Sequence, residues 1–184
     1  MFVQTDTTPN PNSLKFLPGK TVSKVGSYEF ELKDKKTLNN TLISNILSVN
    51  GVKSVFLGDD FISVNKSEEV TWEDIKHIVI SLINEYYQSG QSFVIDKDPY
   101  KKVSQENLVE IEKQIINILD TKIRPAVARD GGDIKFKEFK DGIVKVQLQG
   151  SCSGCPSSTM TLKQGVQNLL CHYLPEVKEV VAIQ

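Results

Sequence analysis

Two cysteines separated by two residues, Cys152 and Cys155, are the side chains in this sequence best suited to chemistry. They lie in residues 150–156, Gly-Ser-Cys-Ser-Gly-Cys-Pro, between an expected strand and an expected helix. Thiolates at this spacing either bind a soft metal centre or cycle between dithiol and disulfide. Because proline suits the first turn of a helix, we expect Cys155 at the helix N-cap. Unpaired backbone N–H groups and the positive end of the helix dipole would then favour thiolate over thiol.

The same loop supplies too few ligands for a complete metal site. A tetrahedral zinc ion or a [4Fe–4S] cluster normally takes four protein ligands. The third cysteine, Cys171, follows Cys155 by 16 residues on the same expected helix, which places it about 24 Å away at ~1.5 Å per residue. We therefore expect Cys171 to be a small buried residue and His172 a surface residue near the helix end. The missing ligands would come from a second copy of the loop in a two-fold dimer, or from a client protein.

Three functions are compatible with such a half-site: a metal-cluster carrier, a thiol–disulfide oxidoreductase, and an interaction module bridged by zinc. The loop lacks the Cys-Gly-Pro-Cys pattern of thioredoxins, which disfavours the oxidoreductase. The rest of the sequence contains no catalytic constellation, and His77 is expected to be an ordinary surface or boundary residue. We therefore expect that the protein is not an enzyme.

Composition indicates a globular protein that does not bind polyanions. The 184 residues are 39% hydrophobic and 24% charged, with a formal net charge of −1. Nucleic acids and anionic membranes attract a clear basic excess, so neither is an expected partner. No apolar run approaches the roughly 18 residues of a membrane span, and the segment after Met1 resembles neither a signal peptide nor an Arg-rich presequence. Three cysteines, an odd number, favour a reducing compartment. We expect the bacterial cytoplasm, with the mitochondrial matrix as the alternative if a presequence has been removed.

The first half predicts a small α+β unit. Short strands are expected near residues 2–5, 14–17 and 28–33, and Gly58-Asp59-Asp60 predicts a hairpin between strands 52–57 and 61–65. Thr71 and Asp74 predict a capping box at the start of a helix. The apolar stripe expected for that helix consists of Ile75, Ile78, Leu82 and Tyr86. A last strand is expected over 93–95.

The second half has the order helix, strand, strand, helix, strand. We expect a helix from Ser104 to Ile123 that Pro125 kinks or ends. Strands over 134–139 and 143–149 should be joined at Asp141-Gly142, and a helix from Pro156 should lead to a strand over 177–183. The fold class is therefore α+β, with two small domains over 1–98 and 104–184 and a polar linker over 99–103.

These motifs closely resemble the C-terminal domain of NifU-like, or Nfu-type, iron–sulfur cluster scaffold and carrier proteins. The match runs through Ile123-Arg124-Pro125, Asp130-Gly131-Gly132-Asp133, the cysteine segment, Thr161-Leu162-Lys163 and Pro175-Glu176-Val177. The first half is similar to the N-terminal domain of mitochondrial and alphaproteobacterial members, chiefly through Thr8-Pro9-Asn10-Pro11-Asn12 and Asp60-Phe61-Ile62. Together the two matches cover nearly the whole chain outside the linker.

The resemblance implies a function and a ligand set. It implies one [4Fe–4S] cluster per homodimer, with Cys152 and Cys155 of each copy as ligands. The cluster would be accepted from upstream iron–sulfur assembly proteins and passed to apo iron–sulfur recipient proteins, among which it suggests lipoate synthase and cluster proteins of the respiratory complexes. The domain over 1–98 contains no ligands, and we expect it to dock partners.

Overall fold

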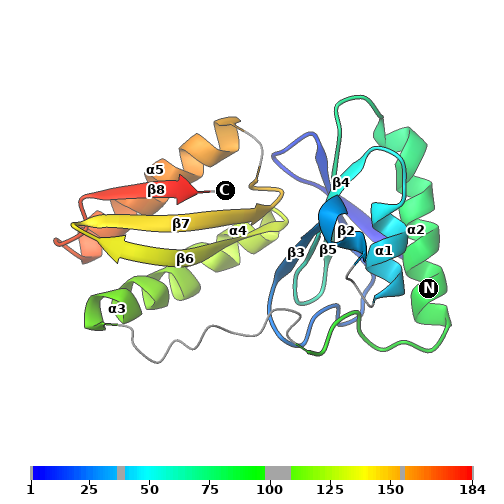
Figure 1. The fold of residues 1–184 in the computed structure, drawn as a ribbon, viewed down its shortest axis with the longest axis horizontal. Helices are drawn as coiled ribbons and strands as arrows, with labels where there is room; N and C mark the ends of the chain where they lie inside the picture. The colour runs from blue at the N-terminus through cyan, green and yellow to red at the C-terminus, as the bar shows by residue number, and fades with distance from the viewer. Residues whose placement is uncertain (1, 37–39, 98–108, 154–155, 184) are drawn as a thin grey trace. The chain divides into compact units, whose positions relative to one another are not determined.

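A computed structural model describes residues 2–36, 40–97, 109–153 and 156–183 (Figure 1). The chain divides into two compact units, Met1–Pro99 and Tyr100–Gln184. Each unit combines a sheet with helices, which confirms the α+β class and the two small domains. The expected linker over 99–103 lies outside the described residues, as does Ser104.

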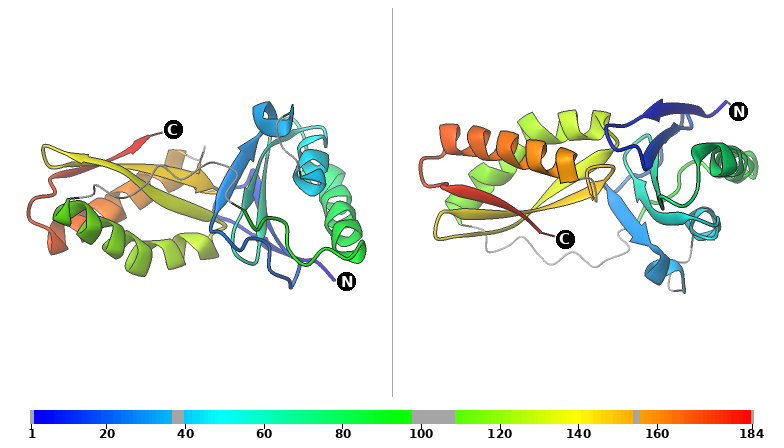
Figure 2. Two further views of the ribbon diagram at one scale, coloured as in Figure 1. Left: turned by 60° about the horizontal axis from the view of Figure 1, so that its bottom comes forward. Right: turned by 90° about the horizontal axis from the view of Figure 1, so that it is seen from above.

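The first unit is built on a five-stranded antiparallel sheet in the order β1-β2-β5-β4-β3. The strands are β1 (Gln4–Thr7), β2 (Ser13–Leu17), β3 (Tyr28–Glu31), β4 (Val52–Leu57) and β5 (Ile62–Lys66). The predicted hairpin joins β4 to β5, where Gly58 N–H donates to the Phe61 carbonyl over 2.9 Å. A 3₁₀ turn (Leu32–Lys36) follows β3. Helices α1 (Thr41–Leu47) and α2 (Trp72–Gln88) cover one face of this sheet (Figures 1 and 2).

Helix α2 begins where the capping box predicted it. The Asp74 carboxylate accepts hydrogen bonds from the Thr71 N–H (3.0 Å) and the Thr71 hydroxyl (2.7 Å). The predicted apolar stripe is wrong in part, because Ile78 is 47% exposed. The buried stripe is Ile75, Val79, Ile83 and Tyr87. Apolar residues surround more than one face of this helix, so periodicity alone leaves its rotation open, and packing against the sheet selects the buried face.

The strand predicted over 93–95 is also wrong. Ile95 forms only an isolated bridge with Ser23. Backbone bonds to residues 22–24 hold part of the segment, since Val94 and Ile95 donate their N–H groups to the Val22 carbonyl over 2.9 and 3.1 Å. Side chains add to them: the Tyr86 hydroxyl donates to the Phe93 carbonyl over 3.1 Å, and the Asn40 amide donates to the Val94 carbonyl over 2.7 Å. These bonds satisfy the backbone without a full ladder, which a short apolar run cannot reveal.

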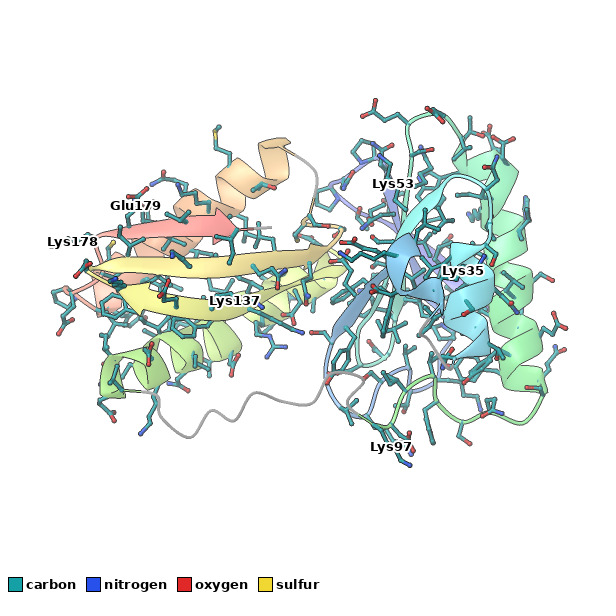
Figure 3. All side chains as sticks on the ribbon, viewed as in Figure 1. Lys35, Lys53, Lys97, Lys137, Lys178 and Glu179 are labelled. Carbon is teal, nitrogen blue, oxygen red and sulfur yellow. The ribbon has the colours of Figure 1, made fainter. Side chains whose placement is uncertain are left out.

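The second unit has a three-stranded sheet in the order β6-β7-β8. Strands β6 (Gly132–Lys140) and β7 (Ile143–Gly150) are antiparallel, and β8 (Glu179–Ile183) runs parallel to β7 after the crossover helix α5 (Pro156–Tyr173). The predicted Asp-Gly turn is confirmed, because Asp141 and Gly142 both have positive φ, 54° and 85°. Lys178 and Glu179 lie beside this turn and donate their backbone N–H groups to the Gly142 carbonyl over 2.7 and 3.2 Å (Figure 3).

The first helical segment of this unit differs from the prediction. It consists of α3 (Glu110–Ile118), a π-helical turn (Leu119–Ile123) and α4 (Arg124–Arg129). Pro125 therefore does not end the helix. It occupies the first turn of α4, where its missing N–H removes no established bond, and the wider turn before it relieves the ring clash. The segment and α5 cover one face of the sheet (Figure 2).

Each unit has a hydrophobic core of its own. The larger cluster includes Phe16, Phe30, Ile46 and Val79 from the first unit. The smaller cluster includes Ile115, Val144 and Val166 from the second unit, together with Cys152. Among the helices that the structure describes, none has the length and apolar character needed to cross a membrane.

Candidate metal centre

The cysteine loop connects β7 to α5 in the second unit. Strand β7 ends at Gly150 and α5 begins at Pro156, as the sequence predicted. The structure describes Ser151, Cys152 and Ser153, whereas Gly154 and Cys155 lie outside the described residues. Of the two predicted ligands, the structure therefore describes the surroundings of Cys152.

Cys152 points into the protein rather than out of it. The residue is only 6% exposed and belongs to the same buried cluster as Ile134, Leu148 and Val166. Its Sγ lies 4.0 Å from the Ser151 hydroxyl, and its carbonyl accepts a 3.3 Å hydrogen bond from the Thr159 hydroxyl of α5. A metal centre shared with a second chain lies at a surface, so this thiol has to turn outward before it can act as such a ligand.

The turn before β6 holds the cysteine loop in place. Ser151 donates its backbone N–H to the Gly131 carbonyl over 3.2 Å, and its hydroxyl donates to the Asp130 carbonyl. Gly132 pairs with Gly150 across the sheet. A Cβ on Gly132 would lie 2.7 Å from the Cys152 Sγ and 2.6 Å from the Gln149 carbonyl oxygen. The Asp-Gly-Gly-Asp turn and the cysteine loop therefore form a single site, and the close approach requires glycine.

An ion pair fixes the other end of this turn. Arg124 binds Asp133 in a bidentate manner, with Nε to Oδ1 at 2.7 Å and Nη2 to Oδ2 at 2.8 Å. Asp133 is 4% exposed and also accepts the Ile134 N–H over 2.8 Å. Arg124 Nη1 reaches Asp120 at 3.1 Å. The hydrogen bond to Asp133 raises the pKa of Arg124 more than burial lowers it. The sequence pattern did not predict this pair, although Arg124 belongs to the Ile123-Arg124-Pro125 motif and Asp133 to the Asp-Gly-Gly-Asp motif.

The other candidate residues lie away from the loop. Cys171 is half-buried against the second core near the opposite end of α5 from the cysteine loop, so it is less buried than expected. His172 is exposed, with its ring centroid 5.2 Å from that of Tyr173, and His77 is exposed on α2. Over the described ranges, no group of three or more His, Cys, Asp or Glu side chains is placed to hold a metal ion.

Comparisons with known proteins match both halves of the chain. Residues 115–181 match the family model described as NifU-like domain, and residues 3–90 match the model described as Scaffold protein Nfu/NifU N terminal. The human protein named NFU1 iron-sulfur cluster scaffold homolog, mitochondrial, is 45% identical over 181 residues, which cover 98% of this chain and 71% of that protein. NifU-like protein 4, mitochondrial, of Arabidopsis thaliana is 44% identical over 185 residues, which cover 98% of this chain and 65% of that protein.

Solved structures include a similar protein as well. The solution NMR structure of a NifU-like protein from Saccharomyces cerevisiae is 33% identical, with a TM-score of 0.48. That match covers 53% of this chain and 87% of the yeast chain.

Proposed function

Because this chain belongs to the family of NifU-like (Nfu) proteins, we propose that it is an iron–sulfur cluster scaffold and carrier. Cys152 and Cys155 of two copies hold one [4Fe–4S] cluster, which is the protein's cargo. The observation on which this proposal depends is the cysteine pair in the loop between β7 and α5. Among the described residues, no group of three or more His, Cys, Asp or Glu side chains could hold a metal ion within one chain. The name of the human relative, an iron–sulfur cluster scaffold homolog, supports the scaffold role.

The ligand count explains why a dimer is part of the proposal. A [4Fe–4S] cluster normally takes four thiolates, and each copy of the loop contributes two. A two-fold contact brings the same loop from each copy to one axis. The cluster then leaves when the two copies separate or when a recipient supplies competing thiolates. The residues bind and release the cluster without catalysing a reaction, so we propose a carrier and not an enzyme.

The partners follow from this role. The cluster comes from upstream iron–sulfur assembly proteins and passes to apo iron–sulfur proteins. The first unit matches the Nfu/NifU N-terminal model, and the two proposed ligands both lie in the second unit. We propose that the first unit docks the protein on its donors or recipients.

The comparisons do not support the expected compartment. The human and Arabidopsis relatives are both named as mitochondrial proteins. These names support the mitochondrial alternative and give no support to the bacterial cytoplasm. We therefore propose a mitochondrial setting for the cluster-carrying role.

Anaerobic reconstitution with ferrous iron and sulfide tests the proposal. We expect a brown protein that sediments as a dimer, with about four iron atoms per two chains. Cys152→Ser and Cys155→Ser should each abolish cluster binding, whereas Cys171→Ser, the matched control on α5, should retain it. A colourless monomer, or a cluster that survives Cys152→Ser, would contradict the proposal. Zinc bound at the same thiols in place of iron indicates an interaction module, and rapid reduction of insulin indicates an oxidoreductase.

A further inference from the structure

The side chain of the proposed ligand Cys152 is buried in the core of the second unit. It lies with Ile134, Leu148 and Val166 in the core and is 6% exposed. A thiol in this position cannot reach a cluster shared between two copies. Ligation therefore requires residues 151–153 to move away from the core, and whatever holds them there also controls Cys152.

Ser151 ties the loop to the turn before β6, while the Thr159 hydroxyl of α5 bonds the Cys152 carbonyl. Ser151 is 2% exposed and makes two bonds to the turn before β6, one from its N–H to the Gly131 carbonyl at 3.2 Å and one from its hydroxyl to the Asp130 carbonyl. The Arg124–Asp133 ion pair fixes the same turn from its other side. Ser151 thus ties the described part of the loop to the turn before β6, one residue before the thiol.

Ser153 provides the contrast within the same loop. Its hydroxyl donates to the Gly150 carbonyl over 2.8 Å, and its N–H donates to the same carbonyl over 3.1 Å. These bonds shape the loop locally, but they do not connect it to residues 130–132. Loss of the Ser153 hydroxyl should therefore leave the tie between the loop and the turn intact.

We propose that Ser151 is a positioning residue that keeps the Cys152 thiol in the core until a cluster is taken up. Release of the Ser151 hydroxyl from the Asp130 carbonyl accompanies the outward turn of Cys152. The inference rests on the proposed function only in naming an iron–sulfur cluster as the group that Cys152 binds. In the absence of a cluster, the tie shields this thiol from oxidants and alkylating reagents.

Thiol alkylation of the full-length protein without iron tests the inference. The apo-protein is treated with iodoacetamide under anaerobic conditions at constant pH, and peptide mass spectrometry follows Cys152 and Cys171 separately. Losing one hydrogen bond should raise the open population, so Ser151→Ala should alkylate at Cys152 about 3- to 10-fold faster than the wild type. Cys171 should react at an unchanged rate, and Ser153→Ala should label Cys152 at the wild-type rate.

Three results would overturn the inference. In the first, Ser151→Ala accelerates both cysteines equally, which indicates general destabilisation rather than release of the loop. In the second, Cys152 of the wild type reacts as fast as it does in urea, which shows that the thiol is not held in the core. In the third, Ser151→Ala leaves the Cys152 rate unchanged.

Native-state hydrogen exchange covers the case in which Ser151→Ala does not fold. In the wild type, the amide of Ser151 should exchange faster than the amide of Val146 in the middle of β7, because the loop opens locally. Equal protection of the two amides would contradict local opening. Reconstitution remains a separate experiment: failure of the wild type to bind a cluster contradicts the proposed function, and the alkylation rates still decide the role of Ser151.

Discussion

Gly132 shows how a single residue without a side chain makes room for a proposed ligand, the Cys152 thiol. The space that its Cβ would occupy is taken by the Cys152 thiol and by the backbone carbonyl of Gln149. A carbonyl in a paired strand cannot move aside as a flexible side chain can. Any larger residue at 132 must therefore displace the strand, the thiol or both.

Gly132→Ala should destabilise the second unit by about 1–3 kcal/mol through this overpacking. The same change should speed alkylation of Cys152, since the thiol is pushed from its site. Gly165→Ala is the matched control: apart from its chain neighbours and the nearby backbone of α5, no atom lies within 4 Å of a Cβ added at this position. It should stabilise the protein by about 0.5–1 kcal/mol. Urea unfolding checks both values, and equal stability of Gly132→Ala and the wild type would contradict the packing argument.

At the scale of elements, one ion pair joins the first helical segment of the second unit to its sheet. Arg124 lies at the start of α4, and Asp133 lies near the start of β6. The pair therefore sets the position of the turn on which the cysteine loop rests. Its strength comes from the bidentate geometry and from the burial of Asp133, since exposed pairs contribute little.

Arg124→Ala should cost about 2–3 kcal/mol, because it leaves the buried Asp133 carboxylate without its cation. The loss is smaller than that for a fully buried pair because the Arg124 side chain is 37% exposed and solvent screens its charge. Lys145→Ala is the control, since it breaks the pair with Glu138 in which the two side chains are 45% and 47% exposed. That variant should lose less than about 0.5 kcal/mol. Similar losses in the two variants by chemical denaturation would contradict the assigned role of Asp133 burial.

Tyr87, near the end of α2, should make the free energy of unfolding of the first unit depend on pH in the alkaline range. Burial raises the pKa of Tyr87, whose hydroxyl donates to the Thr21 carbonyl over 3.0 Å. In the unfolded chain a tyrosine loses its proton near pH 10, about where model tyrosines titrate, whereas the folded protein retains it. The free energy of unfolding should therefore fall as pH rises above about 10.

Trp72 is the only tryptophan of the chain and lies in the first unit, so its fluorescence reports this loss. Tyr87→Phe removes the titrating group. The free energy of unfolding of this variant should fall less steeply over the same pH range, even if it is lower than that of the wild type at neutral pH. If the free energy of unfolding of Tyr87→Phe falls with pH as steeply as that of the wild type, Tyr87 does not contribute to the pH dependence.

At the scale of the whole molecule, each unit carries its own buried core. The described members of the larger cluster lie between Val3 and Ile95, and those of the smaller cluster lie between Ile111 and Ala182. No described member of either cluster belongs to the other unit. The two units are therefore expected to fold separately, with different tasks.

Deletion of residues 1–98 should leave the remaining chain folded and able to bind a cluster, because both proposed ligands and their supporting turn lie in the second unit. Transfer to some recipient proteins should slow, since the docking unit is lost. Circular dichroism and reconstitution check the first expectation, and transfer kinetics check the second. Unchanged transfer to every recipient tested would remove the docking role.

Signals that depend on neighbouring residues were sufficient to predict much of the fold. The Thr71–Asp74 capping box, the Asp141-Gly142 turn and the start of α5 at Pro156 are each set by the conformational limits of a few adjacent residues. Predictions failed where distant contacts decide. The rotation of α2 and the irregular segment over 93–95 depend on packing and hydrogen bonds from other elements.

The same division applies to the candidate site. Residue types and helix geometry were enough to predict the two thiols, their spacing and the shortage of ligands in one chain. The burial of Cys152 and its tie through Ser151 to residues 130–131 arise from contacts that only the folded chain makes. The two segments lie 21 residues apart, between Asp130 and Ser151, and the pairing of β6 with β7 brings them together. A contact of this kind has no local sequence signal, because it forms only when the sheet does.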